Sequence, residues 1–110
     1  MIVVTVRVRV RTERRREFLQ TVRALIPPTR GEKGCVSCHW YTDIEDENVF
    51  RLVQAWETRP DLENHLKSDP TRVLTGAILL LCEPLALEIS TLAAVPGPNV
   101  RKAMLGRGRG

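Results

Sequence analysis

Aromatic residues and histidines are scarce in this 110-residue chain. It contains two Trp, two Phe, one Tyr and two His. Any aromatic pocket or acid–base site must therefore draw on a small set of side chains. The longest apolar run, AILLLC at residues 77–82, is also far shorter than the roughly 20 residues of a membrane-spanning helix. We therefore expect no membrane association.

A secretory leader is also missing from the first ten residues. A signal peptide has a continuous apolar core, whereas MIVVTVRVRV alternates apolar and polar residues and includes Arg7 and Arg9. This alternation is typical of a strand. We therefore expect the protein to be cytoplasmic.

Excess charge is confined to the end of the chain. The net charge is +4, and residues 96–110 contain four basic residues and no acidic one. The remaining chain is balanced, whereas a nucleic-acid-binding surface needs a basic face. We therefore expect no nucleic-acid partner. The final segment contains Gly and Pro but no aromatic residue, so we expect one domain over residues 1–95 followed by a disordered basic tail over 96–110.

Four segments have the composition of strands. They cover residues 2–10, 35–42, 49–56 and 85–92. In the first, Val4, Val6, Val8 and Val10 share one face. Apolar residues at helical spacing lie between the first and second strands and between the third and fourth.

Local signals predict where the helices begin and end. Thr12 is a candidate cap for the first helix, which we expect to end at Pro27-Pro28. Thr58 is a candidate cap for the second. That helix should restart at Asp69-Pro70, because proline fits a first helical turn, and end at Pro84.

The resulting order, β-α-β-β-α-β, predicts a ferredoxin-like α+β fold. In this fold two helical segments cover one face of a four-stranded antiparallel sheet. The other face also carries Val and Leu residues, and exposed apolar area on that scale marks an interface. We therefore expect a homodimer that packs sheet against sheet.

The segment CVSCH at residues 35–39 matches the pattern of covalent haem attachment. In a regular strand, Cys35 and Cys38 would point to opposite faces, which argues against a haem site or a redox pair. A zinc site would need a fourth ligand, for which Cys82 and His65 are the only soft candidates. We expect reduced, buried thiols and no metal.

Cofactor-binding motifs are absent as well. The chain has no Gly-rich phosphate loop, no G-x-S-x-G elbow and no H-E-x-x-H. The third strand, VFRLVQAW, also lacks the Gly and aromatic pattern of RNA-binding domains that share this fold. What remains is a small pocket with aromatic rings and one or two imidazoles.

The candidate pocket combines one face of the third strand with the helix that follows. The strand face carries Phe50, Leu52, Gln54 and Trp56. On the helix, Leu62, His65 and Leu66 share one side, which should face the sheet. A single imidazole in such a position is more often a hydrogen-bonded core residue than a catalyst.

The second strand should also have two distinct rows. Val36, Cys38 and Trp40 would form an apolar row, and Ser37, His39 and Tyr41 a polar one on the opposite face. His39 and Tyr41 are therefore second choices for the site, or dimer contacts.

Residues 2–92 resemble the antibiotic biosynthesis monooxygenase domain family of the dimeric α+β barrel superfamily. The resemblance rests on the alternating first strand, on Gly34-Cys35 and on the F-x-x-x-x-x-W-E-T pattern from Phe50 to Thr58. It also rests on the H-L-x-S pattern from His65 to Ser68. The family implies a ferredoxin-like homodimer.

The resemblance also implies an activity. Characterised members include monooxygenases that oxidise quinols or polycyclic phenols with O2 and no metal, flavin or haem. His65 would then be the base or proton relay, since an unperturbed histidine has a pKa of about 6.5. Trp56, Phe50 and Leu52 would hold a flat aromatic ring, and Gln54 would hydrogen-bond a hydroxyl or carbonyl. Gln54 replaces a carboxylate that is common in the family.

Other functions stay open within the same fold. One is a non-catalytic dimer that binds a small aromatic ligand or is associated with stress. Another is an isomerase or decyclase. A haem-degrading branch fits poorly, because the first strand has no Asn and Thr75 occupies the position of that branch's haem-ligating His.

Overall fold

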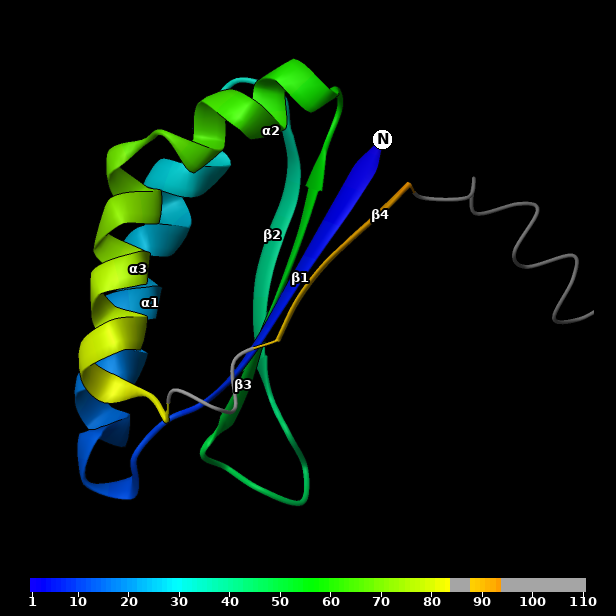
Figure 1. The fold of residues 1–110 in the computed structure, drawn as a ribbon. Helices are drawn as coiled ribbons and strands as arrows, with labels where there is room; N and C mark the ends of the chain where they lie inside the picture. The colour runs from blue at the N-terminus through cyan, green and yellow to red at the C-terminus, as the bar shows by residue number, and fades with distance from the viewer. Residues whose placement is uncertain (84–87, 94–110) are drawn as a thin grey trace, which may run out of the picture.

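The computed structural model describes residues 1–83 and 88–93. The first half comprises β1 (Ile2–Arg9), the short 3-10 helix η1 (Thr12–Arg14), α1 (Arg15–Arg30) and β2 (Cys35–Thr42). The second half comprises β3 (Val49–Trp56), α2 (Arg59–Leu66), α3 (Asp69–Leu81) and β4 (Glu88–Ala93). This order confirms the β-α-β-β-α-β prediction, with the second helical region divided in two (Figure 1).

The strands form one antiparallel sheet in the order β2-β3-β1-β4. Within the described residues, α1, α2 and α3 lie on the same face of this sheet (Figure 1). The ferredoxin-like fold is therefore confirmed. The predicted tail and residues 84–87, including Pro84 and the expected start of the last strand, lie outside the described residues.

Strand alternation places the core between the sheet and the helices. Val4, Val6, Val8 and Val10 are all buried, as the alternation predicts. Phe18 of α1 is completely buried and meets Phe50 edge to face, with ring centroids 5.1 Å apart. Such pairs stabilise a core beyond the area that they bury.

Helix α1 continues through both prolines to Arg30, so the predicted end at Pro27-Pro28 is wrong. Proline fixes φ near a helical value, which suits a helix, although it removes one N–H donor and crowds the preceding turn. Tertiary contacts also hold this turn. Thr29 is buried, and the Arg30 guanidinium donates to the Cys38 carbonyl at 2.8 and 3.1 Å.

The two predicted helix caps have different outcomes. Thr12 does not cap α1. It begins η1 instead, and its hydroxyl accepts a hydrogen bond from Asn48 Nδ2 at 3.0 Å. Thr58 does cap α2, because its Oγ1 accepts the Asp61 N–H at 3.2 Å. A side-chain oxygen at this position satisfies a backbone donor that the helix leaves unpaired.

A β-bulge at the start of β2 changes the predicted row of side chains. The register skips between Cys35, opposite Trp56, and Ser37, opposite Ala55. The extra residue is Val36, which is half exposed, so its predicted place in the apolar row is wrong. Cys35 packs against the core instead, as Cys38 does. The two thiols therefore share the helix-covered face, because a bulge inserts one residue into the alternation.

The prediction that Cys35 and Cys38 point to opposite faces is therefore wrong, and it no longer argues against a redox pair. Their buried environment does argue against one. Burial raises the pKa of Cys35, and it raises the pKa of Cys38 to about 11. A thiol with a raised pKa is a poor nucleophile, because the thiolate is the reactive form. Cys35, Cys38 and Cys82 are all free.

The buried thiols predict a loss of stability at high pH. Burial raises the pKa of Cys38 and of Cys82 from 9.0 to about 11. Between these values the unfolded chain releases protons that the folded chain retains, so the free energy of unfolding falls as pH rises. We expect a loss of roughly 2 kcal/mol between about pH 9 and 11, after allowing for solvent screening.

Urea denaturation at pH 8, 9, 10 and 11 measures this loss. The double variant with Cys38→Ala and Cys82→Ala is the control, and its stability should depend less on pH in this window. An equal pH dependence in both proteins would contradict the assignment to these thiols.

No helix within the described residues covers the second sheet face (Figure 1). Val3, Val53 and Leu92 lie on it beside Arg7 and Arg51, so its chemistry is mixed. Leu92 is 69% exposed. In the part of the chain that the structure describes, no helix has the length and apolar character needed to cross a membrane.

Candidate active site

His65 is buried where α2 meets the sheet. The Thr58 cap fixes the first turn of α2, and His65 follows four residues after Asp61. Its imidazole stacks on the Trp56 indole at the end of β3, with centroids 4.5 Å apart and planes inclined by 26°. Only 6% of His65 is exposed, and Trp56 is completely buried. The strand end and the helix therefore hold the ring on one side.

Glu32 is the acidic partner of His65. Its Oε2 lies 2.8 Å from His65 Nδ1, and its side chain is only 21% exposed. It comes from the loop between α1 and β2, where Cys35 N–H donates to the Glu32 carbonyl at 3.2 Å. Gly34 has φ of +83° in this turn, which favours glycine. The turn thus aims a carboxylate at the imidazole.

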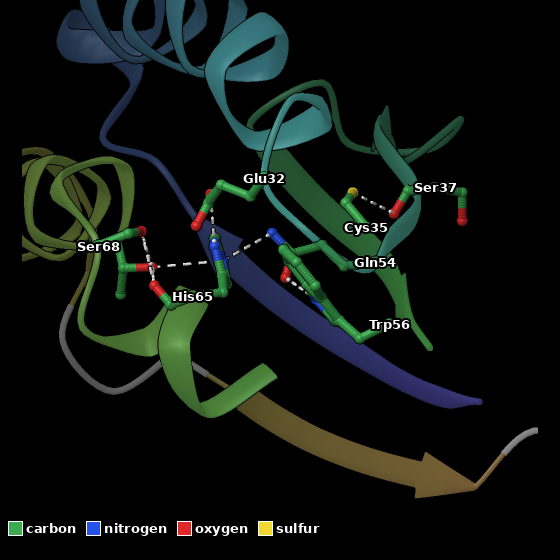
Figure 2. A network of polar contacts seen from close by, with 8 residues as sticks. Glu32, Cys35, Ser37, Gln54, Trp56, His65 and Ser68 are labelled. Atoms are coloured by element: carbon green, nitrogen blue, oxygen red, sulfur yellow. Dashed lines mark hydrogen bonds and ion pairs between the residues drawn. The ribbon is translucent and has the colours of Figure 1, made fainter. Parts of the chain in front are cut away.

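Gln54 links the other imidazole nitrogen to Trp56. Trp56 Nε1–H donates to Gln54 Oε1 at 3.2 Å, and Gln54 Nε2 lies 3.3 Å from His65 Nε2. Figure 2 shows His65 between Glu32 and Gln54, with Trp56 beyond the amide. Gln54 is 4% exposed. Both ends of its amide are therefore already engaged.

The start of α3 holds the backbone of His65. Ser68 Oγ and Thr71 Oγ1 each donate to the His65 carbonyl at 2.6 Å. Thr71 Oγ1 also lies 3.3 Å from His65 Nε2. The histidine thus contacts α3 through both its carbonyl and its ring.

A cavity of about 170 Å³ opens beside His65, between the sheet and the helices. Its polar groups come from Gln54, His65, Thr71 and Thr75, and its walls are otherwise apolar. The apolar lining comprises Val4, Val6, Leu52, Leu66, Leu74, Ile78 and Ile89. An apolar cavity of roughly 150 Å³ can hold a benzene-sized molecule. The space is therefore suited to one aromatic ring next to an imidazole.

The structure brings together only some of the residues predicted from the sequence. Leu52, Gln54 and His65 line the cavity. Trp56 lies behind His65 as its stacking partner. Phe50 does not reach this space, and it lines a separate cleft of about 240 Å³ between α1 and β2.

The second-choice residues lie elsewhere. His39 and Tyr41 are exposed and alternate with Cys38 and Trp40 along β2, so they point away from the cavity. His39 Nδ1 is 3.3 Å from the Arg30 guanidinium. The geometry therefore separates these two residues from His65.

Glu32 and Thr71 are the neighbours of His65 that the sequence prediction missed. Glu32 is 33 residues away from His65, and no local periodicity links a loop carboxylate to a helical imidazole over that distance. A glycine two residues after an acidic residue was the available signal for a tight turn. Among residues 1–83 and 88–93, no group of three or more His, Cys, Asp and Glu side chains is placed to hold a metal ion.

Solved structures share this fold. A crystal structure described as an antibiotic biosynthesis monooxygenase has a TM-score of 0.79 at 23% identity, over 87% of this chain and 100% of that chain. Rv0793 from Mycobacterium tuberculosis has a TM-score of 0.78 at 23% identity, over 86% of this chain and 94% of that one. At these identities the likeness shows the fold alone.

Sequence comparison defines the family. The uncharacterized protein sll1783 of Synechocystis is 31% identical over 67 residues, which make up 61% of this chain and 46% of that protein. The match thus spans about half of that relative's length. A family model described as antibiotic biosynthesis monooxygenase matches residues 1–73, which contain Glu32, Gln54, His65 and Thr71. The chain therefore belongs to the antibiotic biosynthesis monooxygenase family.

Proposed function

We propose that this protein is a cofactor-independent monooxygenase that oxidises a quinol or phenolic substrate with O2. The observation that carries the proposal is the hydrogen-bonded pair of partly buried Glu32 and buried His65, which lies at the wall of an apolar cavity. An imidazole held by a carboxylate is a common arrangement for a general base, since the carboxylate fixes the ring and stabilises its protonated form. Family membership supports a monooxygenase-like activity.

In this mechanism the substrate supplies the electrons. His65 Nε2 removes the proton of a bound hydroxyl, and the resulting anion is far easier to oxidise than the neutral phenol. Both contacts of Nε2 with protein atoms are 3.3 Å long, which is longer than a typical hydrogen bond. A substrate hydroxyl can therefore take the place of the Gln54 N–H at the Nε2 lone pair.

The products follow from the oxygen balance. A quinol that reacts with one O2 gives a hydroxylated quinone and one water, so one oxygen atom enters the ring and the other leaves as water. The quinol provides all the electrons. The apolar walls lower the polarity around His65, which strengthens its interaction with the developing anion.

Cavity volume sets the expected substrate size. The space of about 170 Å³ matches one substituted aromatic ring and is smaller than the roughly 300–1,000 Å³ typical of sites for larger ligands. We therefore expect single-ring quinols to react faster than naphthols, and naphthols faster than three-ring phenols.

Oxygen uptake by metal-free protein tests the proposal. Each quinol or phenol is measured with a chelator present and corrected for its autoxidation, and catalase reports any hydrogen peroxide. Saturable uptake without peroxide supports monooxygenation. Tight binding of a phenol without uptake would instead indicate a ligand-binding protein, and product formation without O2 would indicate an isomerase or decyclase.

The uncovered sheet face supports a homodimer as part of this proposal. Val3, Val53 and Leu92 supply apolar area at its centre, next to Arg7 and Arg51. A second copy packed on this face would bury that area and leave the helix-side cavity of each chain intact. Sedimentation velocity on the same preparation tests this, and a monomer at micromolar concentration would contradict it.

A further inference from the structure

The orientation of the Gln54 amide determines which form of His65 it can accommodate. An indole N–H can only donate, so the amide atom that faces Trp56 Nε1 must be the oxygen. The amide nitrogen therefore faces His65 Nε2 at 3.3 Å, where it can only donate. His65 Nε2 must then be the acceptor.

The other imidazole nitrogen of His65, Nδ1, faces Glu32. With its lone pair on Nε2, a neutral imidazole carries its proton on Nδ1, and Nδ1–H donates to the Glu32 carboxylate at 2.8 Å. The three hydrogen bonds run in one direction, from Trp56 through Gln54 to His65 and Glu32. Every donor along this chain has an acceptor.

We propose that Gln54, locked by Trp56, is a positioning residue that keeps His65 neutral with its lone pair on Nε2. Protonation of Nε2 would bring an N–H against the Gln54 amide N–H. The amide could turn its oxygen to His65 only by placing its nitrogen against the Trp56 N–H. The pair therefore disfavours the imidazolium in the resting site.

Three neighbours oppose this effect, two by electrostatic attraction of a cation and Thr71 by a hydroxyl lone pair. The Glu32 carboxylate favours a protonated ring by charge, and the face of the Trp56 indole attracts a cation. Among the described residues, Glu32 is the only charged side chain in hydrogen-bond contact with His65. Replacement of the Gln54 N–H by an acceptor should therefore favour a proton on Nε2.

Thr71 provides the partner for the opposite state. Its hydroxyl proton is committed to the His65 carbonyl at 2.6 Å, so its lone pairs are what it presents to His65 Nε2 at 3.3 Å. If Nε2 takes a proton from the substrate, the resulting N–H can donate to Thr71 Oγ1. His65 thus has one hydrogen-bond partner at Nε2 for the neutral form and another for the protonated form.

The test uses ¹⁵N NMR of imidazole nitrogens in the full chain at pH 7.5. The chain has only two histidines, so the spectrum is simple and exposed His39 serves as an internal reference. Wild-type His65 should show a protonated Nδ1 and an unprotonated Nε2. A proton on Nε2 in the wild type would overturn the proposal.

Two variants test whether the Trp56–Gln54 hydrogen bond determines the protonation of His65, one at each of the two residues. Gln54→Glu keeps the acceptor for Trp56 but places a carboxylate oxygen at Nε2, so both nitrogens of His65 should become protonated. Trp56→Phe keeps an aromatic ring beside His65 and removes the indole N–H together with the second ring. The amide can then turn, and protonated Nε2 should appear. Unchanged His65 spectra in either folded variant would overturn the proposal.

The effect of Gln54 on catalysis rests on the proposed function, whereas its effect on the protonation of His65 can be measured by NMR without any activity. If His65 is the base, Gln54→Glu should lower oxygen uptake by at least about tenfold, because general-base catalysis contributes roughly 10²–10⁴-fold. Absence of uptake in the wild type would reject the proposed function. The NMR spectra would still test whether Gln54 keeps His65 neutral.

Discussion

Substitution of His65 with asparagine should lower the rate of quinol-dependent oxygen uptake by about 10²–10⁴-fold, the usual contribution of a general base. The amide nitrogen of the new side chain can occupy the place of imidazole Nδ1 and still donate to Glu32. The variant lacks only an equivalent of Nε2, the atom that faces Gln54, Thr71 and the cavity. The change therefore removes the proposed base with little disturbance of the Glu32 carboxylate.

The fold should survive this change. Asparagine and histidine have similar helix propensities, and the stack on Trp56 is the main packing contact that is lost. We expect a loss of about 1–2 kcal/mol in the free energy of unfolding, measured by urea denaturation. His39→Asn, on the exposed face of β2, is the matched control and should keep the wild-type rate. An unchanged rate in His65→Asn would remove His65 from the chemistry.

Gly34→Ala should cause the largest loss of stability. Gly34 has φ of +83°, a conformation that costs a residue with a Cβ about 1–2 kcal/mol. A Cβ at this position would also lie only 2.5 Å from the Asp61 Cβ and 2.3 Å from its Cγ. Asp61 cannot easily move, because its carboxylate accepts a hydrogen bond from the Thr58 hydroxyl at 2.8 Å. Overpacking of this kind costs a further 1–3 kcal/mol, as a rough range.

The combined loss of about 2–5 kcal/mol corresponds to a fall of roughly 10 °C or more in Tm for a domain of this size. Gly76→Ala is the matched control, because its Cβ meets nothing within 4 Å on α3 and alanine is the better helix former. It should raise the stability by up to about 1 kcal/mol. A Tm of Gly34→Ala equal to that of the wild type would contradict the predicted clash.

Gly34→Ala should also affect activity. The turn that contains Gly34 aims Glu32 at His65, and the helix that it would push away carries His65 itself. Both members of the pair would therefore shift. Oxygen uptake should fall even at temperatures where the variant is fully folded.

The sequence predicted the fold well because its signals are local. The alternation of Val4, Val6 and Val8 defines β1, and Thr58 with Pro60 defines the start of α2. These patterns depend on neighbours within one turn or one strand, so no tertiary information is needed. The errors at Pro27-Pro28 and Val36 arose where tertiary contacts or an inserted residue override the local rule.

The site was predicted only in part for the same reason. Leu52, Gln54 and His65 were found because strand and helix periodicity place them on the core side. Glu32 and Thr71 were missed because their relation to His65 exists only after the loop and α3 have packed. The orientation of the Gln54 amide depends on one indole N–H, which no sequence pattern reports.

The sheet order has a consequence for biosynthesis. Strand β1 is made before β3 and β4, yet it lies between them in the sheet. Val6 therefore lacks a partner on one or both edges until Leu52 and then Ile89 have been made. During that time a valine-rich strand with two open edges is exposed to aggregation. Arg7 and Arg9 occupy the polar positions of the alternation, and charges in such a strand act as gatekeepers against intermolecular pairing. We therefore expect the charged residues of β1 to limit aggregation of the chain until β3 and β4 have been made.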